Sequence, residues 1–418
     1  MLSITRCRMP VLRAQWHPTP FKAFQVRRSH RHIPSAQLRA PVNRRPAFPA
    51  FEVLRSRVLS DVGSNRRDIH IPTVLLPPVV FGGLLVALWI WKCTMMVVFQ
   101  NKIIYMPGLP PNARREQIAD WASLCGGIHW SKELTVAADG TELALAVTTI
   151  HLSRGKRPAA AAGQEKQGVV QHVYILYFQG NASSIPPRLP DLSWVLRAAS
   201  DSKAAPPTPV ELTFVCLSYR GYWTSRGRPS EPGLRLDAEA GVRWVAERHG
   251  RAFGENGTAP ILLVWGQSIG SGVATNLAAT GRLPSTMQIK GLLLETPFVS
   301  IRAMLEELYP QKWLPYKYLW PFLRNHLDSW SNLGLIAQAA KGRGEAPPMI
   351  YILQAERDEI VPKEQSERLY QRCLDLGLAV EKVVVPVAYH QQAIARGDGK
   401  KLAAQAILTL VKRSLNSP

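Results

Sequence analysis

The chain has 418 residues and a formal net charge of +21. This length allows one large domain with additional segments and an extensive buried core. A strong positive charge is typical of nucleic-acid-binding proteins, but residues 1–70 alone hold fourteen basic and three acidic side chains, a net +11. Because about half of the excess charge lies in that one segment, and no zinc-finger, RNA-binding or helix-turn-helix pattern occurs, we expect no nucleic-acid partner.

Residues 1–70 are rich in Arg, Pro and Ser, and no acidic residue precedes Glu52. The beginning of the segment is compatible with a mitochondrial presequence, which is basic and poor in acidic residues. Frequent prolines from Pro10 onward weaken the amphipathic helix that a presequence forms. The segment is therefore predicted to be either a targeting sequence or a disordered basic tail, and its cleavage is left open.

Residues 71–99 form an apolar segment in which the first charge is Lys92. A run of about 20 apolar residues spans the hydrocarbon core of a bilayer, so we predict a single transmembrane helix that anchors the chain. Because the basic residues precede this helix, the positive-inside rule predicts the N-terminus on the cytosolic side, or on the matrix side of a mitochondrion. We expect an endomembrane such as the endoplasmic reticulum, with the mitochondrial inner membrane as the alternative.

Residues 100–418 are predicted to form the folded domain. It begins with a β-hairpin over 133–150, and further apolar strands then alternate with helices. The strands are expected near 173–178, 212–217, 260–265, 290–295, 349–354 and 382–387, and the helices near 235–248, 269–280, 363–376 and 399–415. This alternation is typical of an α/β fold with a mostly parallel sheet and helices on both of its faces.

A G-x-S-x-G sequence, Gly266-Gln267-Ser268-Ile269-Gly270, lies between an apolar strand and a helix rich in small residues. This context is that of a nucleophile elbow, a sharp strand-to-helix turn that presents a serine hydroxyl. Glycine on either side removes Cβ atoms that would collide where strand and helix approach. We predict Ser268 as a nucleophile; the alternative is a glycine-rich turn that holds an ordinary serine.

An acid and a histidine are expected to follow the serine in chain order. Asp358 lies in the loop after the strand near 349–354, with Glu356 and Glu359 as competitors. His390 follows the last strand and is the only histidine after Asp358. A serine hydroxyl is a weak nucleophile until an imidazole removes its proton, and the carboxylate holds the imidazole in the required tautomer. The predicted triad is therefore Ser268, Asp358 and His390.

A tetrahedral intermediate also needs backbone N–H donors for its oxyanion. The N–H of Ile269, directly after the serine, is one predicted donor. The second is expected from the loop after the strand near 173–178, where we favour the N–H of Asn181 and place Gly180 second. The alternative is a simple turn at the end of that strand.

A lid is predicted at about 299–346, where the alternation of strands and helices is interrupted. Five aromatic residues crowd into a short part of it: Trp313, Tyr316, Tyr318, Trp320 and Phe322. They are interpreted either as packing within the lid or as a surface that binds acyl chains or contacts a membrane, where aromatic side chains are enriched.

Together these motifs resemble the α/β-hydrolase superfamily and, within it, the membrane-anchored BEM-like α/β-hydrolase-domain proteins. Three further blocks carry the resemblance, which runs from about residue 99 to the end of the chain: FQNKIIYMP at 99–107, YRGY at 219–222 with PSEPGL at 229–234 and Asp237, and ETPFVSI at 295–301. The resemblance implies an α/β-hydrolase fold and a serine hydrolase that acts through an acyl-enzyme on esters or thioesters of lipid-like acyl groups.

The sequence departs from the family at three places. Gln179 stands where the family has a histidine, Trp223 where a small residue is common, and Gln391-Gln392 where an Asn-Asp pair is common. These departures motivate a second interpretation, a catalytically weak or inactive scaffold in a membrane-associated complex. A soluble peptidase of the same fold is a third, which the apolar segment disfavours.

We therefore expect a membrane-anchored serine hydrolase that cleaves carboxylic esters or thioesters of lipids or acylated proteins. No cysteine pair has CxxC spacing and no Cys/His cluster has the spacing of a metal site, so no metal is expected. The predicted chemistry requires no organic cofactor. The acyl chain length and the oligomeric state are not predicted.

Overall fold

The computed structural model describes residues 72–153, 170–254, 258–312, 314 and 316–416. The chain divides into two units, Met1–Pro72 and Thr73–Pro418. The predicted tail or targeting sequence, residues 1–70, lies outside the described residues. The second unit contains the apolar segment and the whole predicted hydrolase domain.

A sheet of eight strands forms the centre of the second unit, in the order β1-β2-β4-β3-β5-β6-β7-β8. The strands β1 to β8 are Ser131–Val136, Glu142–Leu152, Gln171–Phe178, Val210–Leu217, Ile261–Gln267, Ile289–Glu295, Met349–Ala355 and Val380–Val385. β2 runs antiparallel to β1 and β4, and the other neighbours are parallel. This order and direction are those of the α/β-hydrolase fold, so the predicted fold is confirmed.

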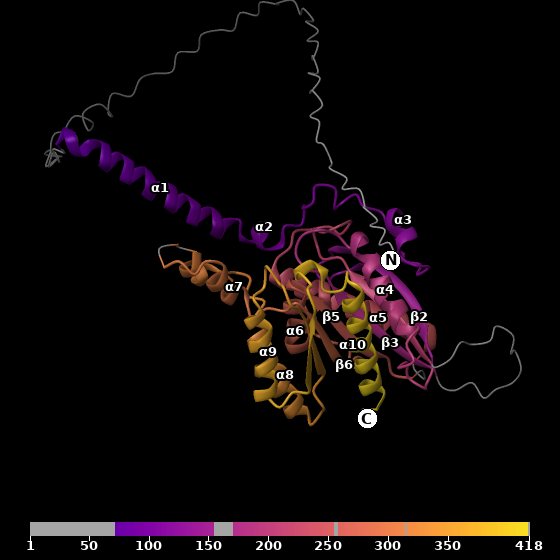
Figure 1. Ribbon diagram of the computed structural model, residues 1–418. Helices are drawn as coiled ribbons and strands as arrows, with labels where there is room; N and C mark the ends of the chain where they lie inside the picture. The colour runs from indigo at the N-terminus through magenta and orange to yellow at the C-terminus, as the bar shows by residue number, and fades with distance from the viewer. Residues whose placement is uncertain (1–71, 154–169, 255–257, 313, 315, 417–418) are drawn as a thin grey trace, which may run out of the picture. The chain divides into compact units, whose positions relative to one another are not determined.

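Helices connect the strands and begin the unit (Figure 1). The α-helices α1 to α10 are Leu76–Val98, Gln100–Tyr105, Ile118–Trp121, Leu189–Ser200, Glu231–Phe253, Ile269–Thr280, Ile301–Leu308, Ser329–Arg343, Lys363–Asp375 and Gly397–Asn416. The 3₁₀ helices η1 to η5 are Thr73–Leu75, Ala122–Leu124, Pro186–Arg188, Tyr316–Phe322 and His390–Gln392. Because the strands are parallel, helices must return the chain to the start of each next strand.

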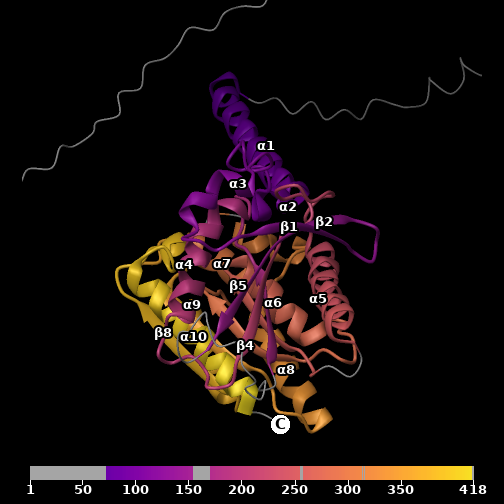
Figure 2. The same ribbon diagram turned by 90° about the vertical axis from the view of Figure 1, so that its right-hand side faces the viewer.

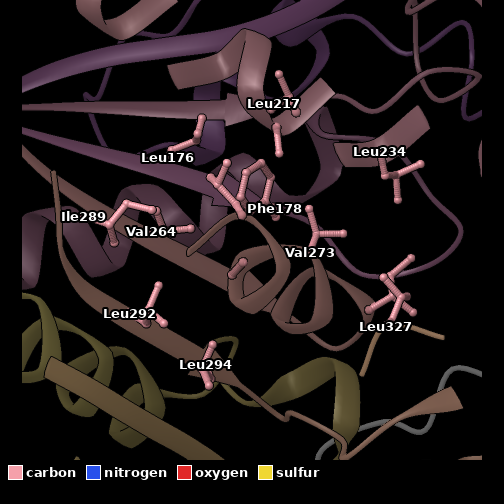
Figure 3. Close-up of a cluster of buried hydrophobic side chains, with 14 of the residues drawn as sticks. Leu176, Phe178, Leu217, Leu234, Val264, Val273, Ile289, Leu292, Leu294 and Leu327 are labelled. Carbon is pink, nitrogen blue, oxygen red and sulfur yellow. The ribbon is translucent and has the colours of Figure 1, made fainter. Parts of the chain in front are cut away.

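Both faces of the central part of the sheet are buried. Alternate residues of a strand point to opposite faces, so Leu262 and Val264 of β5 pack with α5 and α6, while Leu263 and Trp265 pack with α4 and α10. Figure 2 shows α4 and α10 on one side of the sheet and α5 on the other. Figure 3 shows the core on the α5–α6 side, where Val273 of α6 lies among side chains of the strands. This burial explains why the strands were recognisable as apolar runs.

The region predicted as a lid contains three helices that differ in burial. Leu333 and Ile336 of α8 are buried in the core that includes α6, so the later part of the region is an integral layer of the domain. α7 and η4 instead carry exposed apolar side chains, including Leu308 and Trp320. We use "lid segment" for residues 301–323 only.

Among the described residues one helix is long and apolar enough to cross a bilayer by length and composition. It comprises η1 and α1, Thr73–Val98. Its most apolar stretch has a mean hydropathy of 2.2, and none of the residues in that stretch is buried. Prolines occupy the first turn of α1, where a missing N–H costs no hydrogen bond. α2 follows α1 after Phe99 and leads to the hydrolase domain (Figure 1).

Candidate active site

Ser268 lies at the turn between β5 and α6. Its backbone angles are φ 52° and ψ −117°, on the left-handed side that residues with a Cβ rarely adopt. The Ser268 N–H donates to the carbonyl of Glu295 on β6 at 2.8 Å, and the Ser268 carbonyl accepts the N–H of Ser271 at 2.8 Å. These bonds hold the unfavourable conformation, and the hydroxyl stands at the N-terminus of α6. The catalytic role of Ser268 stays a prediction.

The glycines of the G-x-S-x-G sequence leave no room for side chains. A Cβ on Gly266 would lie 2.2 Å from the carbonyl oxygen of Gly270, and a Cβ on Gly270 would lie 2.1 Å from that of Phe178. Between them, the Gln267 side chain accepts a hydrogen bond from the Tyr177 hydroxyl at 3.0 Å. The close contact of strand and helix therefore depends on the absence of a side chain at both glycines.

His390 and Asp358 form a buried pair at the ends of β8 and β7. Nδ1 of His390 lies 2.9 and 2.8 Å from the two carboxylate oxygens of Asp358, and the side chains are 1% and 4% exposed. Oδ1 of Asp358 also accepts the N–H groups of Ile360 at 3.0 Å and Val361 at 2.7 Å. The carboxylate is thus fixed in position, and it favours the tautomer with the proton on Nδ1. Nε2 is then left as a proton acceptor.

Nε2 of His390 is buried and has no hydrogen-bond partner among the described residues. The two competing acids bind the backbone of the histidine loop instead of the ring. Glu359 accepts the N–H of His390 at 2.9 Å, and Glu356 accepts the N–H of Val387 at 2.6 Å. Of the three acids, Asp358 alone contacts the imidazole within the part of the chain that the structure describes, and its catalytic role stays a prediction.

The loop after β3 passes beside the serine. A Cβ added to Gly180 would lie 3.6 Å from Cβ of Ser268, so the loop is in contact distance of the nucleophile. The Ala182 N–H donates to the carbonyl of Tyr105 in α2 at 3.0 Å. The N–H groups of Gly180, Asn181 and Ile269, our predicted oxyanion donors, have no partner among the described residues.

A tyrosine outside the predicted site orients this loop. The hydroxyl of Tyr219 donates to the carbonyl of Gln179 at 3.1 Å. Burial raises the pKa of Tyr219 well above its usual value, so the hydroxyl stays protonated and can donate. Because C=O and N–H point in opposite directions across a trans peptide, this bond also fixes the direction of the Gly180 N–H.

The comparisons with known proteins agree with this architecture. Protein bem46 of Schizosaccharomyces pombe is 30% identical over 204 residues, which cover 48% of this chain and 56% of bem46. Lysophosphatidylserine lipase ABHD12 of Danio rerio is 31% identical over 210 residues, which cover 49% of this chain and 48% of that protein. The chain is thus similar in sequence to BEM-like α/β-hydrolase-domain proteins. It spans about half the length of these curated relatives.

No protein-family model matches the chain. A solved α/β-hydrolase from Vibrio vulnificus is 19% identical, covering 75% of this chain and 92% of its own, with a TM-score of 0.49. Within the described residues there is no group of three or more His, Cys, Asp or Glu side chains that could hold a metal ion.

A buried ion pair connects the serine and histidine parts of the candidate site. The Glu295 side chain is fully buried and accepts hydrogen bonds from Arg188 at 2.5 Å and from the Trp265 indole at 3.1 Å. The Glu295 carbonyl holds the N–H of Ser268, and Arg188 also donates to the carbonyl of Gln391 at 3.1 Å. Glu295 and Arg188 therefore join the turn at Ser268 to the residue that follows His390.

Sequence reasoning missed Arg188. Burial lowers the pKa of its guanidinium, but Glu295, Tyr177 and Asp191 together outweigh burial, so the pKa lies above its ordinary value and the guanidinium stays charged. The available signal was Glu295 itself, a charged residue at the end of an apolar strand, which is rarely buried without a partner. Nothing in the sequence around Arg188 identified it as that partner.

We expect Arg188→Met to lower the free energy of unfolding by about 3–5 kcal/mol, because it leaves the Glu295 carboxylate buried and unpaired. Denaturant unfolding in detergent measures this value. The double variant Arg188→Met, Glu295→Leu should recover most of the loss. Arg251→Met is the matched control, since its pair with Glu247 is exposed and should contribute about 0–1 kcal/mol. Equal losses in the single and double variants would contradict the assignment.

Proposed function

We propose that the chain is a membrane-anchored serine hydrolase that cleaves carboxylic esters or thioesters of lipids or acylated proteins. The observation that carries the proposal is the buried His390–Asp358 pair, whose Nε2 is unpartnered, at the same sheet edge as the strained turn of Ser268. In parallel strands the carboxyl ends meet at one edge, and ligands bind there. The name of the ABHD12 relative, a lysophosphatidylserine lipase, supports a lipid ester as substrate.

The chemistry follows from the roles of the three side chains. Oγ of Ser268 attacks the acyl carbon while Nε2 of His390 takes its proton, and Asp358 stabilises the imidazolium through Nδ1. The oxyanion accepts the N–H of Ile269 and that of Asn181 or Gly180. Collapse of the intermediate expels the alcohol or thiol, which receives the proton from His390 and leaves an acyl-enzyme. Water then attacks the acyl-enzyme with His390 as base, and the carboxylic acid is released.

Two features support a substrate from a membrane. α1 exposes apolar side chains around its circumference, including Phe81, Leu84, Val86 and Ile90, which is unfavourable in water and favourable in lipid. A pocket beside the site is lined by polar residues of the loop after β3, by Arg188 and Asp191, and by Gln267 and Gln391. A chain with both an apolar anchor and a polar pocket suits a substrate that has an acyl chain and a polar headgroup.

The experiment that tests this function is a substrate panel on the full chain in mixed micelles. We expect hydrolysis of a lysophospholipid, a monoacylglycerol and an acyl thioester, and much slower cleavage of the matching amide, which has a poorer leaving group. The protein should also stay in the membrane pellet after extraction with high salt or alkaline carbonate. A folded protein that hydrolyses none of these esters would contradict the catalytic proposal, and release by salt alone would contradict the anchor.

A further inference from the structure

An apolar groove lies where the last turn of α1 meets α2 and the lid segment. Its walls include Met96 of α1, Ile103 and Ile104 of α2, and Leu305 and Leu319 of the lid segment, and none of its lining residues is charged. The amide of Gln100, which also lines it, is engaged in hydrogen bonds with its neighbours. The groove therefore presents a surface suited to a hydrocarbon chain.

The groove is held by specific contacts between α1 and the segment that follows the lid. The Arg324 guanidinium donates to the carbonyls of Val97 at 3.1 Å and Val98 at 3.2 Å. These carbonyls belong to the end of α1, where helix carbonyls lack intrahelical partners and favour a cation. Gln100 donates to the carbonyl of Phe322 at 3.1 Å and accepts the N–H of Arg324 at 2.7 Å. These bonds attach the end of the lid segment to the junction of α1 and α2.

The groove lies at the end of the proposed membrane span. Residues 71–91 carry no charge and are long enough for the hydrocarbon core, so Lys92 marks the interface. The Lys92 ammonium lies 5.1 Å from the ring centroid of Tyr316 in the lid segment, and Arg302 lies 4.2 Å from that of Trp320. Trp320 and Phe322 are 43% and 60% exposed. Aromatic side chains accompanied by cations are typical of the headgroup level.

The same segments lead from the groove to the candidate active site. The carbonyl of Tyr105, at the end of α2, accepts the N–H of Ala182 in the oxyanion loop. Ile301, another lining residue and the first of α7, follows β6 closely, and the last residue of β6, Glu295, holds the N–H of Ser268. Two walls of the groove are thus continuous with the segments that position the oxyanion loop and the nucleophile.

We propose that this groove binds the acyl chain of the substrate, which enters laterally from the bilayer around α1. The inference rests on the proposed hydrolase function and deepens it, because it assigns the acyl end of the substrate to the junction of α1, α2 and the lid segment. The exposed aromatic residues of the lid segment then rest in the headgroup layer and keep the groove open to lipid. Of our two interpretations of these aromatic residues, the inference adopts the one that involves acyl chains and membrane.

Filling the groove tests the inference. Leu305→Trp and Ile103→Trp should lower kcat/KM for a palmitoyl ester by about tenfold or more. The loss or gain of one methylene group in an apolar pocket already changes kcat/KM about tenfold, and each tryptophan would displace several methylene groups of the acyl chain. Hydrolysis of a butyryl ester should stay within about twofold of the wild type, since so short a chain gains little from the groove. Leu335→Trp, at an exposed leucine of α8, is the matched control and should change neither ratio. Equal losses for both esters, or no loss for the palmitoyl ester, would overturn the inference.

A second measurement does not depend on hydrolysis. Ser268→Ala in phosphatidylcholine vesicles is irradiated with a lysophospholipid that carries a diazirine on its acyl chain. We expect cross-links in residues 96–104 and 301–323, and their loss in Ser268→Ala, Leu305→Trp. Cross-links confined to other segments would overturn the groove even if the wild type hydrolyses esters. If the wild type hydrolyses no ester, the proposed function fails, while the position of the cross-links still decides on the groove.

Discussion

Ser268→Ala is expected to lower kcat for ester hydrolysis by about 10⁶-fold, the loss typical of removing a serine nucleophile. The variant retains the turn and its backbone donors but lacks the oxygen that forms the acyl-enzyme. Ser268 lies at the turn between β5 and α6 with φ 52°. Alanine lacks only the hydroxyl oxygen, so the substitution adds no atom where the strand and the helix meet. Single-turnover release of the alcohol from a lipid ester in micelles measures the effect.

Two controls separate this chemical loss from a loss of folding. Ser285→Ala, at an exposed serine in the loop after α6, should retain the activity of the wild type. The double variant Ser268→Ala, His390→Ala should be no less active than either single variant, because residues that act as one unit have non-additive effects. Full activity in Ser268→Ala would remove the basis of the proposed mechanism.

Gly270→Ala is expected to destabilise the domain by at least about 3 kcal/mol, the upper part of the range for overpacking. The added Cβ would lie 2.1 Å from the carbonyl oxygen of Phe178 and 2.8 Å from that of Gln179. Both neighbours are backbone atoms at the end of β3, so they can yield only if β3 and α6 separate. That movement would also displace the oxyanion loop. Chemical denaturation gives the loss of stability, and the hydrolysis assay gives the accompanying loss of activity.

Gly334→Ala is the matched control for this prediction. Gly334 lies inside α8, and the nearest atom to its added Cβ is the end of the flexible Arg372 side chain, at 3.2 Å. Alanine in a helix interior should stabilise the domain by about 0.5–1 kcal/mol relative to glycine. The close-contact explanation is wrong if the two substitutions change stability by similar amounts.

Local patterns predicted most of the fold. The central strands β3, β5, β6 and β7 are apolar runs because both faces of the sheet are buried there, whereas the edge strand β1 alternates exposed and half-buried positions. The predicted position of Asp358 followed from the same logic, since it comes directly after an apolar strand. The structure added the contact that separates it from Glu356 and Glu359, which is between side chains and so has no signature in the order of residues.

What the sequence could not predict depends on contacts between distant residues. The pair of Arg188 and Glu295 joins positions 107 residues apart. The bonds of Arg324 to Val97 and Val98 span more than 220 residues. α8 was included in the predicted lid because its apolar residues do not reveal that they pack against α6. Each of these features depends on contacts between elements that are far apart in the chain, so no pattern within one element predicts it.

The alternative of an inactive scaffold rests on the departures at Gln179 and at Gln391-Gln392. In the structure the Gln391 carbonyl accepts a hydrogen bond from Arg188, and the Gln179 carbonyl accepts one from Tyr219. Both positions are thus tied to the site through their backbones, which any side chain allows. The departures therefore do not remove the contacts that orient His390 and the oxyanion loop.

Labelling of the full-length, membrane-bound protein with a fluorophosphonate tests the central claim most directly, because this reagent reacts with activated serines. The wild type is compared with Ser268→Ala and His390→Ala. We predict strong labelling of the wild type, none of Ser268→Ala and greatly reduced labelling of His390→Ala. A folded wild type that is not labelled would contradict a catalytic Ser268 and would favour the scaffold.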